Sequence, residues 1–95
     1  MATFIVHVEL HGASPADYVP LHAAMERRGF DRTILDSTGR TLRLPRSTYR
    51  YLTAAEVDSV VMEAVEAAKT VSESFAIVAV ESKGLAFWDL KPDPK

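Results

Sequence analysis

The sequence predicts an α+β fold in which four strands and two helices follow the order β-α-β-β-α-β. Residues 3–11 alternate apolar and mainly polar side chains with a period of two, which is typical of a half-buried strand. Residues 53–68 repeat apolar side chains three and four residues apart, which is the spacing of a helix. Ninety-five residues fit one domain, which we expect to span residues 1–90, with a disordered tail at 91–95.

A helix is expected after the first strand. It has two alternative starts, with either Ser14 or Asp17 as the N-cap, and Gly29 suits the left-handed position that closes it. One face of this helix carries Tyr18, Leu21, His22 and Met25. A histidine beside apolar neighbours is more often a hydrogen-bonded core residue than a catalyst, so we expect that role for His22. Residues 30–36 are predicted to form the second strand.

The second half of the chain supplies the remaining elements. Residues 40–46 are expected to form an extended arm, since Pro45 makes them a poor central strand, and residues 48–52 form the third strand. A capping-box pattern at 53–56 predicts the start of the second helix. Its buried stripe is predicted to be Val57, Val60, Val61, Ala64, Val65 and Ala68. Residues 74–81 form the fourth strand, which is apolar on both faces and is therefore expected to be covered on both.

This order of elements is that of a ferredoxin-like unit, in which two helices lie on one face of a four-stranded antiparallel sheet. The other face is left open, and we expect it to carry Ile5, His7, Glu9, His11, Phe75, Ile77 and Glu81. The apolar tail at 85–90 is expected to add a further strand, on this chain or on a neighbouring protomer. An open apolar face and a small core together predict a homodimer.

Composition excludes several classes of protein. The chain has no cysteine, which removes thiol catalysis, disulfides and every cysteine-type zinc site. No apolar run approaches the ~20 residues of a membrane span, and the first residues lack the basic region of a secretory signal. We therefore expect a soluble cytoplasmic domain with no membrane partner. Gly-rich phosphate loops and serine-hydrolase motifs are also absent from the sequence.

The net charge of −2 conceals two regions of opposite sign. All seven arginines lie within residues 27–50, which contain two acidic residues and carry a net charge of +5, whereas the rest of the chain carries −7. Guanidinium groups bind phosphates in a bidentate manner, and tyrosine rings stack on unpaired bases. The candidate residues for binding single-stranded RNA or an acidic protein surface are Arg27, Arg28, Arg40, Arg43, Arg46, Tyr49, Arg50 and Tyr51.

A structural interpretation of the same residues remains open. The tyrosines would then be ordinary sheet residues, and the arginines would pair with Glu56, Asp58, Glu63 and Glu66 of the second helix. Arg27 and Arg28 would interact with the negative end of the first helix.

The motif His7-x-Glu9-x-His11 places three groups capable of acid–base catalysis or metal binding on one strand face. Successive members lie about 6.5–7 Å apart on a strand. Imidazole and carboxylate groups could act as base and acid in RNA transesterification, so these three residues are the catalytic candidates. We expect no cofactor other than a divalent metal at Glu9. The alternative is a polar open face with a cross-strand ion pair, as any half-exposed strand shows.

The chain resembles the GhoS-type endoribonuclease antitoxin family over about residues 3–81. The resemblance rests on Val8–Leu10, on Tyr18 and Leu21–Met25, on Gly29–Asp36, on Leu44-Pro45, and on Ser47–Val57. It implies a ferredoxin-like fold, similar to the small nuclease-like subunit of the CRISPR adaptation complex, and cleavage of a toxin's messenger RNA. Glu9 stands where the CRISPR subunits carry an aspartate proposed to hold a metal across a dimer. By the same analogy, the region of Arg27 and Arg28 would contact phosphate.

Two functional hypotheses follow. The first is a small RNA-binding protein of the GhoS-like type, acting as a weak endoribonuclease or an antitoxin-like regulator. The second is a non-catalytic dimeric protein-interaction module, or a mobile-element regulator, that uses its arginine-rich arm to bind an acidic surface. The sequence leaves open whether the chain is an enzyme.

Overall fold

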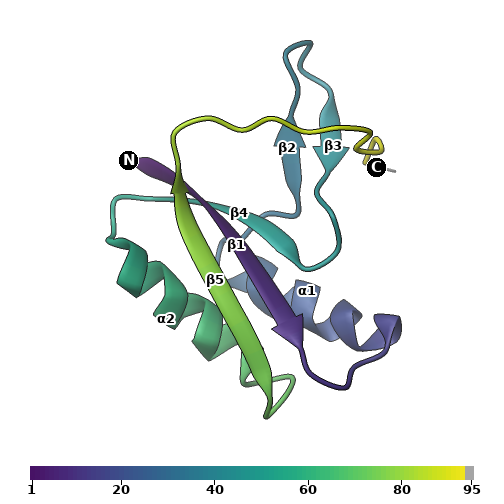
Figure 1. Cartoon of the computed structure of the whole chain (residues 1–95), viewed down its shortest axis with the longest axis vertical. Coiled ribbons are helices and arrows are strands. Elements are labelled where there is room, and N and C mark those ends of the chain that lie inside the picture. The colour runs from purple at the N-terminus through teal and green to yellow at the C-terminus, as the bar shows by residue number, and fades with distance from the viewer. Residues whose placement is uncertain (94–95) are drawn as a thin grey trace.

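The computed structural model describes residues 1–93 and shows a mixed α+β fold with antiparallel sheets and two helices (Figure 1). The elements are β1 (Ala2–Leu10), the short 3-10 helix η1 (Pro15–Asp17), α1 (Tyr18–Arg27), β2 (Thr33–Leu35), β3 (Thr41–Arg43), β4 (Thr48–Thr53), α2 (Val57–Ala68) and β5 (Phe75–Ser82). The proline at the start of η1 and a second one in the first turn of α1 fit where backbone N–H groups need no helical partner.

The strands form two sheets instead of the single four-stranded sheet expected. β1 lies between β4 and β5 and is antiparallel to both, so that Ile5 faces Arg50 on one side and Val80 on the other. β2 and β3 form a separate two-stranded hairpin, with Thr33 opposite Arg43. This hairpin stands away from the main sheet (Figure 1).

The predicted strand at 30–36 is interrupted because its side chains belong to two cores. Phe30 is fully buried in the main core. Asp31 then exchanges two 2.8 Å backbone hydrogen bonds with Arg50 of β4, which is a single bridge and not a ladder. Further on, Ile34 packs in a second small core with Leu42, Leu44 and Leu90. The chain has to leave β4 to reach that second core, so β2 pairs with β3.

Both helices cover the same face of the main sheet. The buried face of β1 presents Phe4, Val6, Val8 and Leu10 to Leu21 and Met25 of α1 and to the small residues of α2, in one continuous core. Gly29 closes α1 as expected, with a φ of +90°. Glycine adopts this left-handed conformation with little strain because it has no Cβ. Within residues 1–93, neither helix is long and apolar enough to cross a membrane.

Helix α2 begins later than the capping box predicts. Glu56 is the N-cap, and Val57 is the first helical residue. The side chain of Thr53 accepts a hydrogen bond from the Ala55 N–H at 3.1 Å, so it closes a local turn instead of capping the helix. The residues that α2 buries fully are Val60, Ala64, Ala67 and Ala68. Val57 is exposed, and Val61 and Val65 are only half-buried.

The expectation that β5 is covered on both faces is wrong, and so is its predicted orientation. Phe75 and Ile77, which were expected on the open face, pack partly buried against the main core, opposite Leu10 and Val8. The open face instead carries the other apolar set, Ala76, Val78 and Val80. Val78 is 61% exposed and Val80 is 52% exposed. Glu81 is exposed, although the alternation of β5 places it on the same face as the core-facing residues Phe75 and Ile77.

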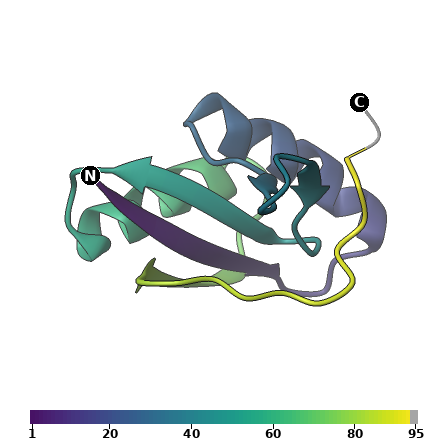
Figure 2. The ribbon, with the colours of Figure 1, turned by 90° about the horizontal axis from the view of Figure 1, so that it is seen from above.

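The C-terminal chain does not extend the main sheet. It leaves the end of β5 and crosses over to the hairpin of β2 and β3 (Figure 1 and Figure 2). There Pro92 forms a bridge to Leu42, the Arg43 N–H donates to the Lys91 carbonyl at 2.9 Å, and the Asp93 N–H donates to the Thr41 carbonyl at 3.0 Å. Residues 91–93 of the expected disordered tail are therefore held against β3. Residues 94–95 lie outside the described residues.

Candidate nucleic-acid interface

The seven arginines divide into an ion-paired group and an unpaired group. The ion pairs are Arg28–Glu63 at 3.0 Å, Arg40–Asp36 at 2.9 Å, Arg43–Asp93 at 2.6 Å and Arg50–Asp31 at 3.2 Å. Only the first of these involves an acidic residue of α2, so the structural interpretation holds for one arginine. Within residues 1–93, no carboxylate lies in ion-pair range of Arg27, Arg32 or Arg46.

Three arginines gather near one histidine, and we call Arg32, Arg43 and Arg46 the arginine cluster. They come from the segment before β2, the end of β3 and the β3–β4 connection. The hairpin places the backbone of Arg32 beside that of Leu44, whose N–H donates to the Arg32 carbonyl at 2.8 Å, one residue beyond the Thr33–Arg43 pair. The charge of Arg43 is close enough to lower the pKa of Arg32. All three positive charges act on the imidazole of His22.

Aromatic rings lie next to the arginine cluster. His22 Nδ1 shares a 2.7 Å hydrogen bond with the hydroxyl of Tyr49, whose ring meets the imidazole edge-on at 5.8 Å. The guanidinium of Arg46 lies 5.4 Å from the ring centre of Tyr18, in cation–π range. The hydroxyl of Tyr18 accepts a hydrogen bond from the Leu10 N–H at 3.0 Å, which ties this ring to the end of β1. The hydrogen bond predicted for His22 is thus confirmed, although its ring is only half-buried.

The electrostatics of the cluster favour an anion. Burial, followed by the charges of Arg32, Arg43 and Arg46, lowers the pKa of His22 to about 4, so the imidazole is neutral at pH 7. Burial and the neighbouring Arg43 also lower the pKa of Arg32, against smaller opposing effects of Tyr49, Glu26 and Asp93. Like charges held close together repel one another, and a bound phosphate would relieve that repulsion.

The lowered pKa of His22 makes stability depend on pH. Between pH 6.5 and about 4 the unfolded chain binds a proton at this position that the folded chain does not, so the free energy of unfolding falls as the pH falls. We expect the His22 imidazole to titrate near pH 4 by NMR, and His22→Gln to flatten the pH dependence of the urea midpoint over this window. His7→Gln, on the open face, is the control. A His22 titration near pH 6.5 would contradict this assignment.

The two tyrosines expected to stack on bases pack inside the fold instead. Tyr49 is fully buried, and burial raises the pKa of its hydroxyl, so its ring cannot meet a base. Tyr51 is half-buried and stacks on Phe30 with ring centres 4.1 Å apart. Arg40 holds the β2–β3 turn through Asp36, and Arg50 donates to the Thr33 carbonyl at 3.3 Å. These four residues support the structure.

The catalytic candidates lie on the other face of the sheet. His7 and Glu9 are exposed on the open face, opposite Val78 and Ala76, whereas Tyr49 points toward the helices with Val6. The nearest approach of Glu9 and His11 is 3.9 Å between Oε1 and Nε2, and His11 Nδ1 shares a 2.8 Å hydrogen bond with Ser74. No hydrogen bond or ion pair within residues 1–93 joins this face to the arginine cluster.

These residues do not fit a zinc site by themselves. Glu9 and His11 provide only two adjacent donors, and residues 1–93 contain no group of three or more His, Asp or Glu side chains arranged around a metal position. A zinc site normally takes at least three protein ligands, whereas a magnesium ion takes one or two carboxylates together with water and phosphate. A divalent metal at Glu9 therefore stays a prediction.

Sequence reasoning missed Arg32 as a member of the cluster. Its neighbours Asp31 and Thr33 place it in a predicted strand and not in the arm that carries the other arginines. The hairpin register is what brings Arg32 beside the arm. The turn-forming residues 37–40 between two short apolar segments carry the sequence signal for that register.

Comparison with known proteins adds no identification. No protein-family model matches the chain, and no curated protein matches it. The resemblance to GhoS-type antitoxins therefore stays a prediction.

Proposed function

We propose that this chain is a cytoplasmic protein that binds single-stranded RNA through the arginine cluster. The observation that carries the proposal is that three guanidinium groups from separate segments lie close enough to one imidazole for their charges to lower its pKa, and that one of them, Arg46, lies 5.4 Å from the ring centre of Tyr18. Two of them, Arg32 and Arg46, have no carboxylate partner within residues 1–93. Within the described residues Asp93 pairs with Arg43 alone, and an RNA backbone would supply a negative charge at every nucleotide for the other two guanidinium groups.

A single strand suits this surface better than a duplex. The cluster lies on a loop and a short hairpin, beside aromatic rings, and neither helix projects from the domain to enter a major groove (Figure 1). The chain also has no asparagine or glutamine, which are the usual readers of adenine edges. Unpaired bases, in contrast, are accessible to ring and guanidinium planes.

The finer fold that we propose is ferredoxin-like, with a reduced second strand. Two features support it. The main sheet places the third strand of the predicted order, β4, and the fourth, β5, on either side of the first. The bridge between Asp31 and Arg50 sets the beginning of the predicted second strand beside β4, where a fourth sheet strand would lie.

Cleavage of RNA is a separate proposal, because its candidates lie on the open face. In the GhoS-type hypothesis Glu9 would transfer protons together with His7 of the same strand or with His11, which follows the end of β1. Glu9 lies 3.9 Å from His11 and all three side chains are exposed, so a substrate can reach them. Glu9→Ala and His7→Ala would abolish cleavage on a denaturing gel and leave RNA binding intact. Retained cleavage in both folded variants would rule this proposal out.

Binding is tested with a short labelled oligoribonucleotide over a series of salt concentrations. Three phosphate contacts predict that log K falls with log salt with a slope of about −2, at roughly 0.7 per neutralised phosphate of a single strand. Fluorescence anisotropy gives the slope. Undetectable binding at low salt, or binding that does not respond to salt, would overturn the proposal.

A dimeric protein-interaction module is the second candidate, favoured by the open face. Val78, Val80 and Leu52 are each more than half exposed there, and their strands are neighbours of β1. Contiguous exposed apolar side chains mark interaction surfaces. Light scattering at tens of micromolar protein would show a dimer mass. A monomer mass would remove the support for this candidate.

A further inference from the structure

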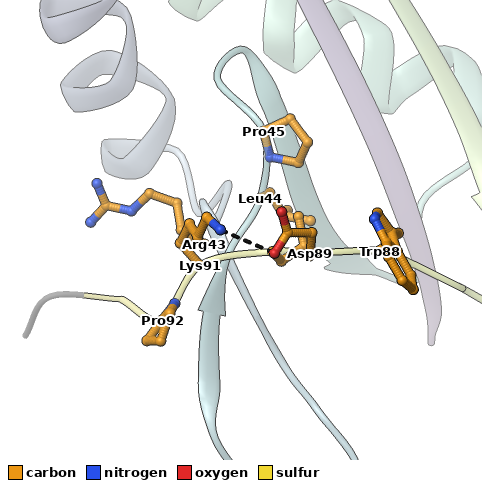
Figure 3. Close-up of a pocket in the computed structure, with 8 residues that line it drawn as sticks. Arg43, Leu44, Pro45, Trp88, Asp89, Lys91 and Pro92 are labelled. Atoms are coloured by element: carbon orange, nitrogen blue, oxygen red, sulfur yellow. Dashed lines mark hydrogen bonds and ion pairs between the residues drawn. The ribbon is translucent and has the colours of Figure 1, made fainter.

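A pocket opens beside the arginine cluster, between the C-terminal chain and the end of β3 (Figure 3). Its volume is about 560 Å³, within the range of small-molecule sites. Its lining residues are Arg43, Leu44, Pro45, Trp88, Asp89, Leu90, Lys91 and Pro92. Figure 3 shows Trp88 at one end of the pocket and the guanidinium of Arg43 pointing away at the other. Arg43 therefore belongs both to this pocket and to the arginine cluster.

Trp88 is held at the edge of the pocket without being buried. The residue is 91% exposed, and the chain that follows it is hydrogen-bonded to β3 at Lys91 and Asp93. Asp89 adopts a left-handed φ of 57°, its carboxylate pairs with Lys91 at 3.0 Å, and Lys91 accepts the backbone bond from Arg43. Tryptophan usually gains stability by burying its large ring. Here the exposed indole lies beside a pocket with apolar walls, so its ring is free to contact a ligand in that pocket.

We propose that this pocket receives one unpaired nucleobase of an RNA strand, stacked on the indole of Trp88, while the neighbouring phosphates contact the arginine cluster. This inference rests on the proposed function. The apolar walls formed by Leu44, Pro45 and Leu90 suit the flat face of a base, and stacking on an aromatic ring tolerates any base. The Asp89 carboxylate is neutralised by Lys91, so the rim does not repel the phosphates. Arg43 connects the base position to the phosphate positions.

The test uses Trp88 as its own reporter, because it is the only tryptophan in the chain. A short oligoadenylate should quench its fluorescence, and an abasic strand of the same length should bind without doing so. Trp88→Ala should raise the Kd for oligoadenylate about tenfold and leave the Kd for the abasic strand unchanged. Phe87→Ala is the matched control, since Phe87 is also exposed but lines a different cavity, with Leu85 and Arg50. Its Kd should stay within about twofold of the parent value.

The outcomes separate the pocket from the arginine cluster. If oligoadenylate binds with no change in fluorescence, and with equal affinity to the parent and to Trp88→Ala, the base site is wrong and the phosphate site stands. If neither strand binds, the proposed function fails and this inference fails with it. If oligoglutamate quenches Trp88 and oligoadenylate does not, the partner is an acidic protein and both are overturned. An unchanged urea midpoint for Trp88→Ala shows that the variant is folded.

Discussion

Replacing Arg32 and Arg46 together with glutamine is expected to weaken binding of single-stranded RNA about 100-fold at low salt. Each guanidinium that binds a phosphate contributes a charge-assisted hydrogen bond, worth about 1.5 kcal/mol at the lower end. Each such loss is roughly tenfold in Kd. Neither side chain has an ion-pair partner to lose within residues 1–93, so the change removes the ligand contact and leaves the ion pairs of the fold in place.

The salt dependence distinguishes a lost contact from a general loss of charge. The double variant should lower the magnitude of the salt slope by about 1.4, that is, about 0.7 for each phosphate contact removed. Arg40→Gln is the control, because Arg40 is exposed and paired with Asp36 at the β2–β3 turn, outside the cluster. Its slope should match that of the parent. An equal fall in slope for Arg40→Gln would show that net charge, and not the cluster, drives binding.

Replacing Phe4 with alanine is expected to lower the free energy of unfolding by about 3–5 kcal/mol. Phe4 is 1% exposed and lies in the central strand, where both helices and both neighbouring strands close around it. Its removal leaves a cavity that the two flanking strands prevent from collapsing. A domain of this length has a total stability of about 5–14 kcal/mol, so urea unfolding should show a variant near the limit of folding at 25 °C.

The matched control for Phe4 is Val80→Ala. Val80 belongs to β5 and faces Ile5, one residue from Phe4, but its side chain points to the open face and is 52% exposed. An exposed position away from caps and ion pairs changes stability by no more than about 0.5 kcal/mol. A loss at Val80 approaching that at Phe4 would mean that the open face is buried in solution, as a second copy of the chain would bury it.

The elements that sequence reasoning located best are those whose side-chain pattern has one period. β1 matches its prediction within one residue at each end, because every second side chain meets the core. β4 and the main part of α2 follow for the same reason. β5 was placed correctly along the chain but turned the wrong way, since apolar residues on both of its faces remove the signal that tells one face from the other.

The remaining errors come from contacts between distant residues. The break between Phe30 and Ile34 depends on two separate cores, one of which needs Leu90 from the far end of the chain. The capping-box pattern at Thr53 is present in the sequence, but α2 begins about one turn later, with Glu56 as its N-cap. Arg43 and Arg46 were found as binding candidates from composition alone, whereas Arg32 joins them only through the hairpin register. The sequence therefore predicted two of the three arginines of the cluster.

The ion pair between Arg43 and Asp93 gives the C-terminal chain a second role. Asp93 presents a carboxylate to Arg43 at 2.6 Å, in the manner in which a phosphate oxygen would approach. This carboxylate is attached to the protein, so its local concentration far exceeds that of any free ligand. An incoming strand that takes Arg43 must compete with it, whereas Arg32 and Arg46 are open from the start. In the proposed complex with RNA, occupancy of the surface would proceed in two stages, and Asp93 would set the threshold for the second.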